Sequence, residues 1–270
     1  MKQLILITVL FISETSFSQN ATSPVKFNVD NFPEVYGGKT EWKRFLHDHL
    51  VYPAAELANK TEGVVQISFI VTSEGKGIEP KIIKSVSPAI DKEALRLLSL
   101  LEWIPSMQYN KPVNVQHSVE INFSVSKYKK WVKERGYEKA LFTDIPLDTS
   151  FAVYESADKG ATFFNSEKTF SEFISSNLEY PEIAKRQSLE GNIVMSFIVE
   201  PDGRVSNIRI KSGIGGGCNE EAIRVIALTT WKPAIKGDKY VRFRMYYTMN
   251  FSLKNSFKDN SNGSQRSWGQ

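Results

Sequence analysis

The sequence predicts an α+β fold built as two tandem units, each a three-stranded antiparallel sheet packed against two helices. Three observations predict this fold. Residues 50–77 (LVYPAAELANKTEGVVQISFIVTSEGKG) return 128 positions later as residues 178–205 (LEYPEIAKRQSLEGNIVMSFIVEPDGRV). Apolar residues alternate with polar ones in several segments of each copy, and other segments have apolar residues at helical spacing. Two copies also argue against a solenoid, which usually needs three or more repeats.

The repeat sets the expected domain boundaries. It places the first unit at residues 31–126 and the second at residues 158–254. Residues 127–157 between them form a charged linker, in which a short amphipathic helix would pack through Trp131 and Leu141. The chain after residue 254 is rich in Ser, Asn and Gly, so we expect a disordered tail at residues 255–270.

Each unit is expected to begin with helices. Residues 41–50 and 169–178 have apolar residues at helical spacing. Tyr52-Pro53 and Tyr180-Pro181 end these helices, because the residue before proline is pushed out of the helical region. Short helical turns can follow at residues 54–59 and 182–187, since proline is tolerated at a first helical position.

A hairpin, a second helix and a long strand complete each unit. Residues 65–71 and 193–199 alternate as half-buried strands, with Phe69 and Phe197 at equivalent places in the two cores. Turns ending in Gly75 and Gly203 lead to strands at 78–85 and 205–212. Apolar stripes predict helices over 90–101 and 218–229, and the last strands span 113–125 and 241–253. The tryptophans between them, Trp103 and Trp231, are expected in the cores.

The first eighteen residues have the layout of a secretory signal peptide. Lys2 precedes an apolar run at residues 4–12 (LILITVLFI), and Ser16-Phe17-Ser18 gives a small-x-small cleavage site before Gln19. A membrane-spanning helix needs roughly 20 apolar residues, so we expect an exported chain without a membrane span. A short buried helix is the alternative interpretation of this run.

Composition narrows the function classes. The only cysteine is Cys218, so an internal disulfide is excluded and the exported chain must rely on its apolar cores. A formal net charge of +4 without a dense basic patch argues against a nucleic-acid partner.

No catalytic constellation is evident, so we expect no enzyme activity, no cofactor and no metal site. His47 and His49 lie two positions apart on a helix and do not share a face. His117 is in the middle of a strand, and Cys218 is on an apolar helix stripe. The glycine run at residues 213–217 lacks the ending of a phosphate-binding loop and is interpreted as a flexible turn.

The order of these motifs resembles the TonB C-terminal domain. The resemblance rests on Tyr-Pro, the alternating strand, the Asp-Gly turn, the Glu-Ala helix, Trp-x-Pro and the long last strand (VRFRMYYTMNFSL in the second copy). The first copy is weaker but collinear, and Ser73-Glu74-Gly75 replaces its Pro-Asp-Gly turn. The resemblance implies a periplasmic protein that takes part in transmembrane transport. It also implies that the domain captures extended segments of TonB-dependent outer-membrane transporters by adding them to its sheet edge.

The sequence lacks two parts of a full TonB energy transducer, the membrane-spanning helix and the proline-rich spacer. We therefore expect the binding role without an energy-transducing role of its own. The alternative is an envelope structural or assembly protein that uses its paired sheets for protein contacts, with no link to transport. Pairing of edge strands into a homodimer also stays open.

The predicted partner-binding site lies on the second unit. Its last strand should pair with the first strand of the sheet and leave its own outer edge free, and the position before Tyr-Pro is polar only in this copy. The basic residues of the strand either form a solvated sheet face or a basic platform for acidic side chains of the partner. The predicted site residues are Glu179, Tyr180, Pro181, Val241, Arg242, Phe243, Arg244, Tyr246, Thr248 and Asn250.

Overall fold

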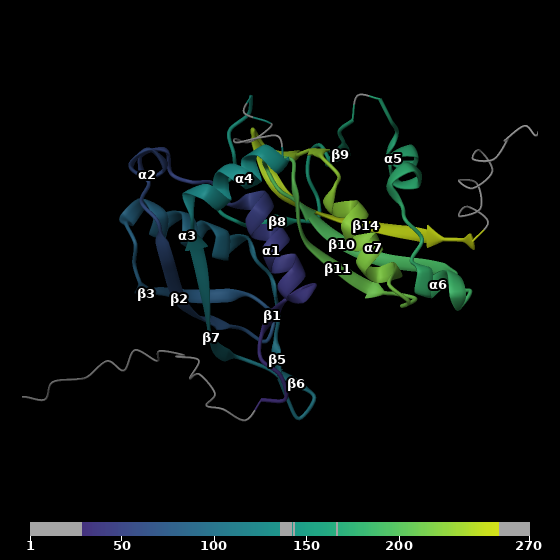
Figure 1. Ribbon diagram of the computed structural model, residues 1–270, viewed down its shortest axis with the longest axis horizontal. Coiled ribbons are helices and arrows are strands. Elements are labelled where there is room, and N and C mark those ends of the chain that lie inside the picture. The colour runs from purple at the N-terminus through teal and green to yellow at the C-terminus, as the bar shows by residue number, and fades with distance from the viewer. Residues whose placement is uncertain (1–28, 136–141, 143, 166, 254–270) are drawn as a thin grey trace, which may run out of the picture.

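In the computed structural model, the protein forms two α+β units that lie side by side (Figure 1). The structure describes residues 29–135, 142, 144–165 and 167–253. The predicted signal peptide, Leu141 and the predicted tail lie outside the described residues. We call the two repeats unit one and unit two.

Unit one has the predicted order of helix, hairpin, helix and strand. Its three-stranded sheet has the order β3-β2-β7, and both pairings are antiparallel. The main elements are α1 (Gly38–His49), α2 (Ala54–Asn59), β2 (Gly63–Val71), β3 (Gly77–Lys84), α3 (Pro88–Leu100) and β7 (Val115–Phe123). Short pairs add β1 (Glu34–Val35) to β4 (Trp103–Ile104) and β5 (Ser106–Gln108) to β6 (Lys111–Val113).

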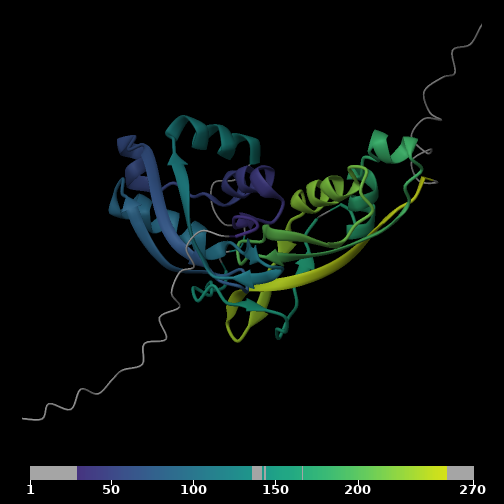
Figure 2. The same cartoon turned by 90° about the horizontal axis from the view of Figure 1, so that it is seen from below.

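Unit two repeats this plan and enlarges the sheet. Its core order is β11-β10-β14, so the last strand pairs with the first, as predicted. The main elements are α5 (Phe170–Asn177), α6 (Glu182–Arg186), β10 (Gly191–Val199), β11 (Val205–Ser212), α7 (Cys218–Ala227) and β14 (Lys239–Phe251). Two additions, β13 (Ala234–Lys236) and β8 (Val153–Tyr154), make five strands. A separate pair joins β9 (Thr162–Phe163) to β12 (Trp231–Lys232). Figure 2 shows β14 as the long yellow strand and the yellow-green helix α7 over one face of the sheet.

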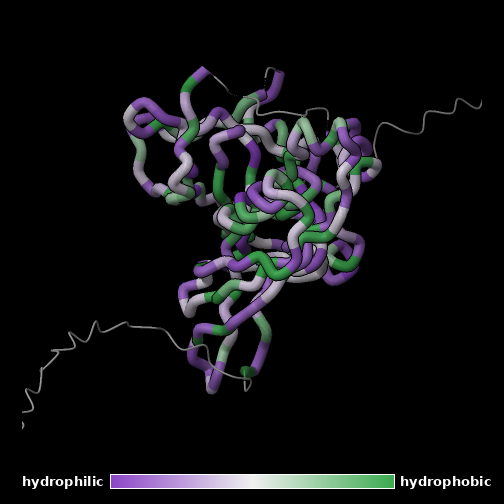
Figure 3. The backbone as a smooth tube through the Cα atoms, turned by 90° about the vertical axis from the view of Figure 1, so that its left-hand side faces the viewer, coloured by the Kyte–Doolittle hydropathy of each residue, from purple (hydrophilic) through white to green (hydrophobic). Residues whose placement is uncertain are grey.

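The cores confirm the predicted apolar faces. Phe69 and Phe197 are both buried, and each packs beside the tryptophan of its own unit, Trp103 or Trp231. Cys218 is buried on the apolar face of α7. In Figure 3, many of the apolar stretches, in green, lie toward the middle of the molecule.

The glycine turns are needed because the backbone approaches closely there. Gly203 has a φ of 86°, and a Cβ on it would lie 2.6 Å from the carbonyl oxygen of Trp231. That close approach lets the Trp231 N–H donate to the Gly203 carbonyl at 2.9 Å. Gly75 and Trp103 repeat the arrangement in unit one. Glycine is favoured because it takes positive φ without a steric penalty.

The segment expected as a charged linker, residues 127–157, belongs to the packed structure where it is described. α4 (Val125–Arg135) continues from β7. Trp131 packs against the core of unit one, as the sequence predicted. Arg135 donates to the carbonyls of residues 47, 48 and 50 at the end of α1. Further along, β8 joins the sheet of unit two.

Candidate functional site

The outer edge of β14 is covered over its first part. β10 pairs with β14 from residue 243 to residue 251 on one side. The short strand β13 pairs with residues 239–241 on the same side as β10. On the opposite side, Leu147 bridges to Tyr240 and β8 runs parallel to Arg242 and Phe243. The prediction that Val241, Arg242 and Phe243 offer an unpaired edge is therefore wrong. Among the described residues, no strand pairs with this side of β14 from residue 244 to residue 251.

Three of the predicted site residues lie exposed beside the unpaired part of the edge. Tyr246 is 59% exposed, and Thr248 and Asn250 are also exposed. The Tyr246 hydroxyl donates to Glu155 at 3.0 Å. This hydrogen bond is the largest cause that raises the pKa of Tyr246. Asn250 donates from Nδ2 to Asn192 Oδ1 on the neighbouring strand at 2.9 Å. These side chains leave one face of the strand open to a partner.

Arg242 is buried, which excludes the predicted role as part of a solvated or partner-facing basic surface. Its Nε lies 2.9 Å from Oε2 of Glu200, the residue that follows β10. Its Nη2 donates to the carbonyl of Leu100 in unit one at 2.7 Å, and its Nη1 donates to the carbonyl of Phe151 at 2.9 Å. The sequence alone could not predict the burial of Arg242, because it results from unit one covering that part of the sheet of unit two.

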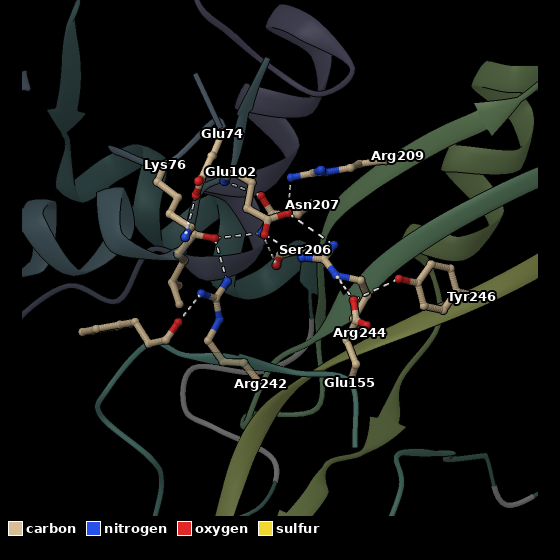
Figure 4. Close-up of polar contacts among 12 residues, drawn as sticks. Glu74, Lys76, Glu102, Glu155, Ser206, Asn207, Arg209, Arg242, Arg244 and Tyr246 are labelled. Carbon is tan, nitrogen blue, oxygen red and sulfur yellow. Dashed lines mark hydrogen bonds and ion pairs between the residues drawn. The ribbon is translucent and has the colours of Figure 1, made fainter. Parts of the chain in front are cut away.

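Arg244 is also directed at unit one. It pairs with Glu102 at 2.6 Å and lies 3.6 Å from Glu155. Glu102 pairs in addition with Arg209 of β11, whose guanidinium lies over the ring of Tyr36 at 3.9 Å. Figure 4 shows Glu102 among Asn207, Arg209 and Arg244. We call the following residues the junction cluster: Glu102, Glu200, Asn207, Arg209, Arg242 and Arg244.

Asn207 joins the two units through its carboxamide. Nδ2 donates to the Leu100 carbonyl at 2.7 Å, and Oδ1 accepts from the Glu102 N–H at 2.7 Å. Its φ of 50° is left-handed, at an irregularity in the β10–β11 pairing. Asn tolerates this conformation better than most residues. The equivalent position in unit one, Glu79, also has a positive φ but is exposed.

His49 is buried at the same junction. Its Nε2 lies 3.1 Å from the carbonyl of Val205 in unit two, and its Nδ1 has no hydrogen-bond partner in the described part of the chain. Burial lowers its pKa from 6.5 to about 4. The imidazole is therefore neutral at neutral pH.

The Tyr-Pro turns are held from inside each unit. The Tyr180 hydroxyl donates to the Leu189 carbonyl, and the Tyr180 ring lies 5.6 Å from that of Phe251. Burial raises the pKa of Tyr180. The N–H of Glu179 donates to Glu221 at 2.6 Å, while the Glu179 side chain is 85% exposed. Of this group, Glu179 is the residue whose side chain faces solvent most openly.

The sequence analysis did not identify the Glu and Arg that hold these turns. Arg224 pairs with Glu221 at 2.7 Å and donates to the Asn177 carbonyl at 2.6 Å. Glu93 and Arg96 make the same contacts in unit one. The repeat contained a signal for these contacts. The pair in unit one lies 128 positions before the pair in unit two, and within each pair the Glu and the Arg are three positions apart on one helix.

Unit one offers a second candidate surface. Among the described residues, no strand pairs with the outer side of β7. A groove of about 610 Å³ borders its Tyr-Pro turn. Its lining includes Tyr52, Pro53, Leu57, Tyr128 and Lys129.

The described residues contain no group of three or more side chains suited to hold a metal ion. Burial raises the pKa of the Cys218 thiol, which disfavours the reactive thiolate. No helix in the described ranges has both the length and the apolar content to cross a bilayer.

Comparison with known proteins matches the repeat. The family described as Gram-negative bacterial TonB protein C-terminal matches residues 48–125 and 176–253. The solution structure of the Pseudomonas aeruginosa TonB C-terminal domain is 28% identical, with a TM-score of 0.25, and the match covers 27% of this chain and 76% of that one. The Helicobacter pylori TonB C-terminal domain is 25% identical, with a TM-score of 0.23, and covers 31% and 76%. No curated protein matches. Because the two matched segments cover more than half of the chain, the protein belongs to the TonB C-terminal domain family and carries the domain twice.

Proposed function

We propose that this protein is a periplasmic, non-catalytic binding module that docks extended segments of outer-membrane transport proteins by strand addition. Membership of the TonB C-terminal domain family supports a TonB-like protein-binding role. The docking mode, the transporter partners and the link to transmembrane transport are the proposal.

The observation that carries the proposal is the second half of the outer edge of β14. Residues 244–251 pair with β10 on one side, and no described strand pairs with them on the other. An edge of this kind offers N–H and C=O groups in a row, and proteins usually protect it with charge, proline or a covering element. Residues 245–251 (MYYTMNF) contain no charged residue and no proline. The edge is therefore suited to accept another strand.

The exposed residues around this edge suggest the contacts of a docked segment. Tyr246, Thr248 and Asn250 line one face of the strand. Tyr180 packs on Phe251, so the exposed Glu179 carboxylate and Pro181 lie at the carboxyl end of the edge. Arg242 and Arg244 already have acidic partners. We therefore expect backbone hydrogen bonds to dominate affinity, with a weak dependence on salt.

The test is titration of the full chain with a synthetic peptide from the periplasm-facing amino-terminal segment of a TonB-dependent transporter, followed by NMR of the backbone amides. We expect shifts concentrated at residues 244–251 and only small ones with a scrambled peptide. Shifts on β7 would move the site to unit one. Shifts confined to the helices, or no binding, would contradict strand addition.

A further inference from the structure

The first half of the β14 edge is occupied by a segment of the same chain. Residues 150–155 (SFAVYE), which we call the strap, run parallel to β14. Val153 lies opposite Arg242, and Tyr154 lies opposite Phe243. An upstream bridge places Leu147 opposite Tyr240 in the same parallel sense. The strap thus adds a strand to the first half of the edge whose second half the proposed function assigns to partner docking, and Glu155 reaches into that second half to Arg244 and Tyr246.

The side chains of β14 hold the strap as they could hold an acidic peptide. Arg242 donates to the Phe151 carbonyl at 2.9 Å. Glu155 accepts from the Tyr246 hydroxyl at 3.0 Å, and its carboxylate lies 3.6 Å from Arg244 (Figure 4). The side chain of Lys236 lies over the ring of Tyr154 at 4.2 Å. Arg242, Phe243, Arg244 and Tyr246, which the sequence assigned to a partner, therefore contact the strap.

The strap is held by few interactions. β8 pairs with β14 at two positions, whereas β10 pairs with it at nine. The Glu155 side chain is 66% exposed, and exposed ion pairs contribute little to stability. Phe151 has a φ of 59°, a left-handed conformation that is unfavourable for a bulky residue. Segments with few contacts open locally without global unfolding.

The described part of unit one has the same three-stranded sheet with no strap on it. In unit one, the positions equivalent to Arg242 and Phe243 are Asn114 and Val115. Over the described residues, no strand pairs with the outer side of β7 at these positions, yet the β3-β2-β7 sheet is complete. Among the described residues, a strap is found in unit two alone.

We propose that the strap is a built-in competitor for this edge, and that the partner shares its chemistry. That partner is an extended protein segment with a β-branched and an aromatic residue followed by a carboxylate, and it docks parallel to β14. The inference rests on the proposed function and adds its regulation. A competitor in the same chain lowers the apparent affinity in proportion to the fraction of time that the edge is open.

The experiment uses the full chain and a peptide copy of the strap, Ser-Phe-Ala-Val-Tyr-Glu-Ser (residues 150–156). The double variant Val153→Gly/Glu155→Ala weakens the strap in place. We expect the variant to bind the peptide at least tenfold more tightly than the wild type does, with amide shifts at residues 240–246. Glu120→Ala, an exposed glutamate on β7, is the matched control and should bind as the wild type does.

Equal affinity in the variant and the wild type, or shifts away from residues 240–246, would overturn the proposal. If the variant does not fold, hydrogen exchange of the backbone amides in the wild-type protein tests the strap proposal instead. The strap amides of residues 153–155 should exchange through local opening, well before those of β10. Exchange of both sets only at the rate of global unfolding would also overturn it.

The same variant separates this inference from the proposed function. If the transporter peptide binds residues 244–251 and the strap peptide binds the variant no more tightly than the wild type, the strap proposal fails and the proposed function stands. If the strap peptide binds the variant more tightly but the transporter peptide binds neither protein, the strap proposal stands and the transporter assignment fails.

Discussion

Arg242 of β14 and Glu200, the residue that follows β10, form an ion pair in which the two side chains are only 4% and 2% exposed. The same guanidinium donates to carbonyls of Leu100 in unit one and Phe151 in the strap. A residue on the sheet of unit two therefore ties together both units and the segment between them.

Removal of the arginine should destabilise the protein strongly. Arg242→Met leaves Glu200 buried without its charge partner, and breaking a buried pair in this way typically costs about 3–5 kcal/mol. We expect a loss of this size in the free energy of unfolding, measured by urea denaturation. Arg242→Met/Glu200→Gln should recover part of it, because the uncompensated charge is gone. Lys239→Met, exposed on the same strand, should have little effect. A small loss for Arg242→Met would show that the pair is unimportant for stability.

Asn207 should control the coupling between the units. Asn207→Gly keeps the left-handed backbone accessible but removes the hydrogen bonds to Leu100 and Glu102. We expect a single calorimetric transition in the wild type to separate into two, or to broaden, in the variant. Glu79→Gly at the equivalent exposed position of unit one should leave the transition as it is. A sharp single transition in both variants would place the coupling elsewhere.

Stability should fall in acid because of His49. Its folded pKa of about 4 lies below its ordinary value of 6.5, so the unfolded chain takes up the proton first. This contribution is fully present above pH 6.5 and is lost as the pH falls toward 4, by roughly 3 kcal/mol in total. Burial dominates the shift, and the charges around the ring are Asp202, Arg204, Glu200 and Asp48.

The variant that tests this origin is His49→Asn, which copies Asn177 of unit two. It should flatten the pH dependence of the unfolding free energy between pH 6.5 and 4, whatever its effect at pH 7. An unchanged slope would assign the acid sensitivity to other groups.

The Tyr180 hydroxyl should contribute more to the stability of the fold than to the affinity for a partner peptide. Tyr180→Phe removes the hydrogen bond to the Leu189 carbonyl but keeps the ring packed on Phe251, so we expect a loss of about 1 kcal/mol in unfolding free energy. Affinity for the transporter peptide should stay close to that of the wild type. Tyr246→Phe, at the exposed edge, is the contrasting control and should leave stability nearly unchanged. A tenfold loss of affinity in Tyr180→Phe would make its hydroxyl a partner contact.

The sequence by itself determined the architecture of each unit. The 128-residue repeat, the alternation around Phe69 and Phe197 and the Tyr-Pro breaks predicted the helices and strands in the right order, because these signals are local and period-dependent. The turn at Gly203 was predictable for the same reason, because the ability of glycine to take a positive φ depends on the residue type alone. The repeat also marked Glu221 and Arg224, although their contacts were not foreseen.

Only the tertiary structure decided which parts of the last strand are accessible. Arg242 and Tyr246 are both non-apolar positions on one alternating strand, and their sequence pattern gives no reason to separate them. One is buried because unit one and the strap cover it, and the other is exposed because the described chain leaves its edge unpaired. Burial of a sheet face by a second domain depends on contacts between residues about 100 positions apart, such as Leu100 and Asn207, and periodicity carries no information about such contacts.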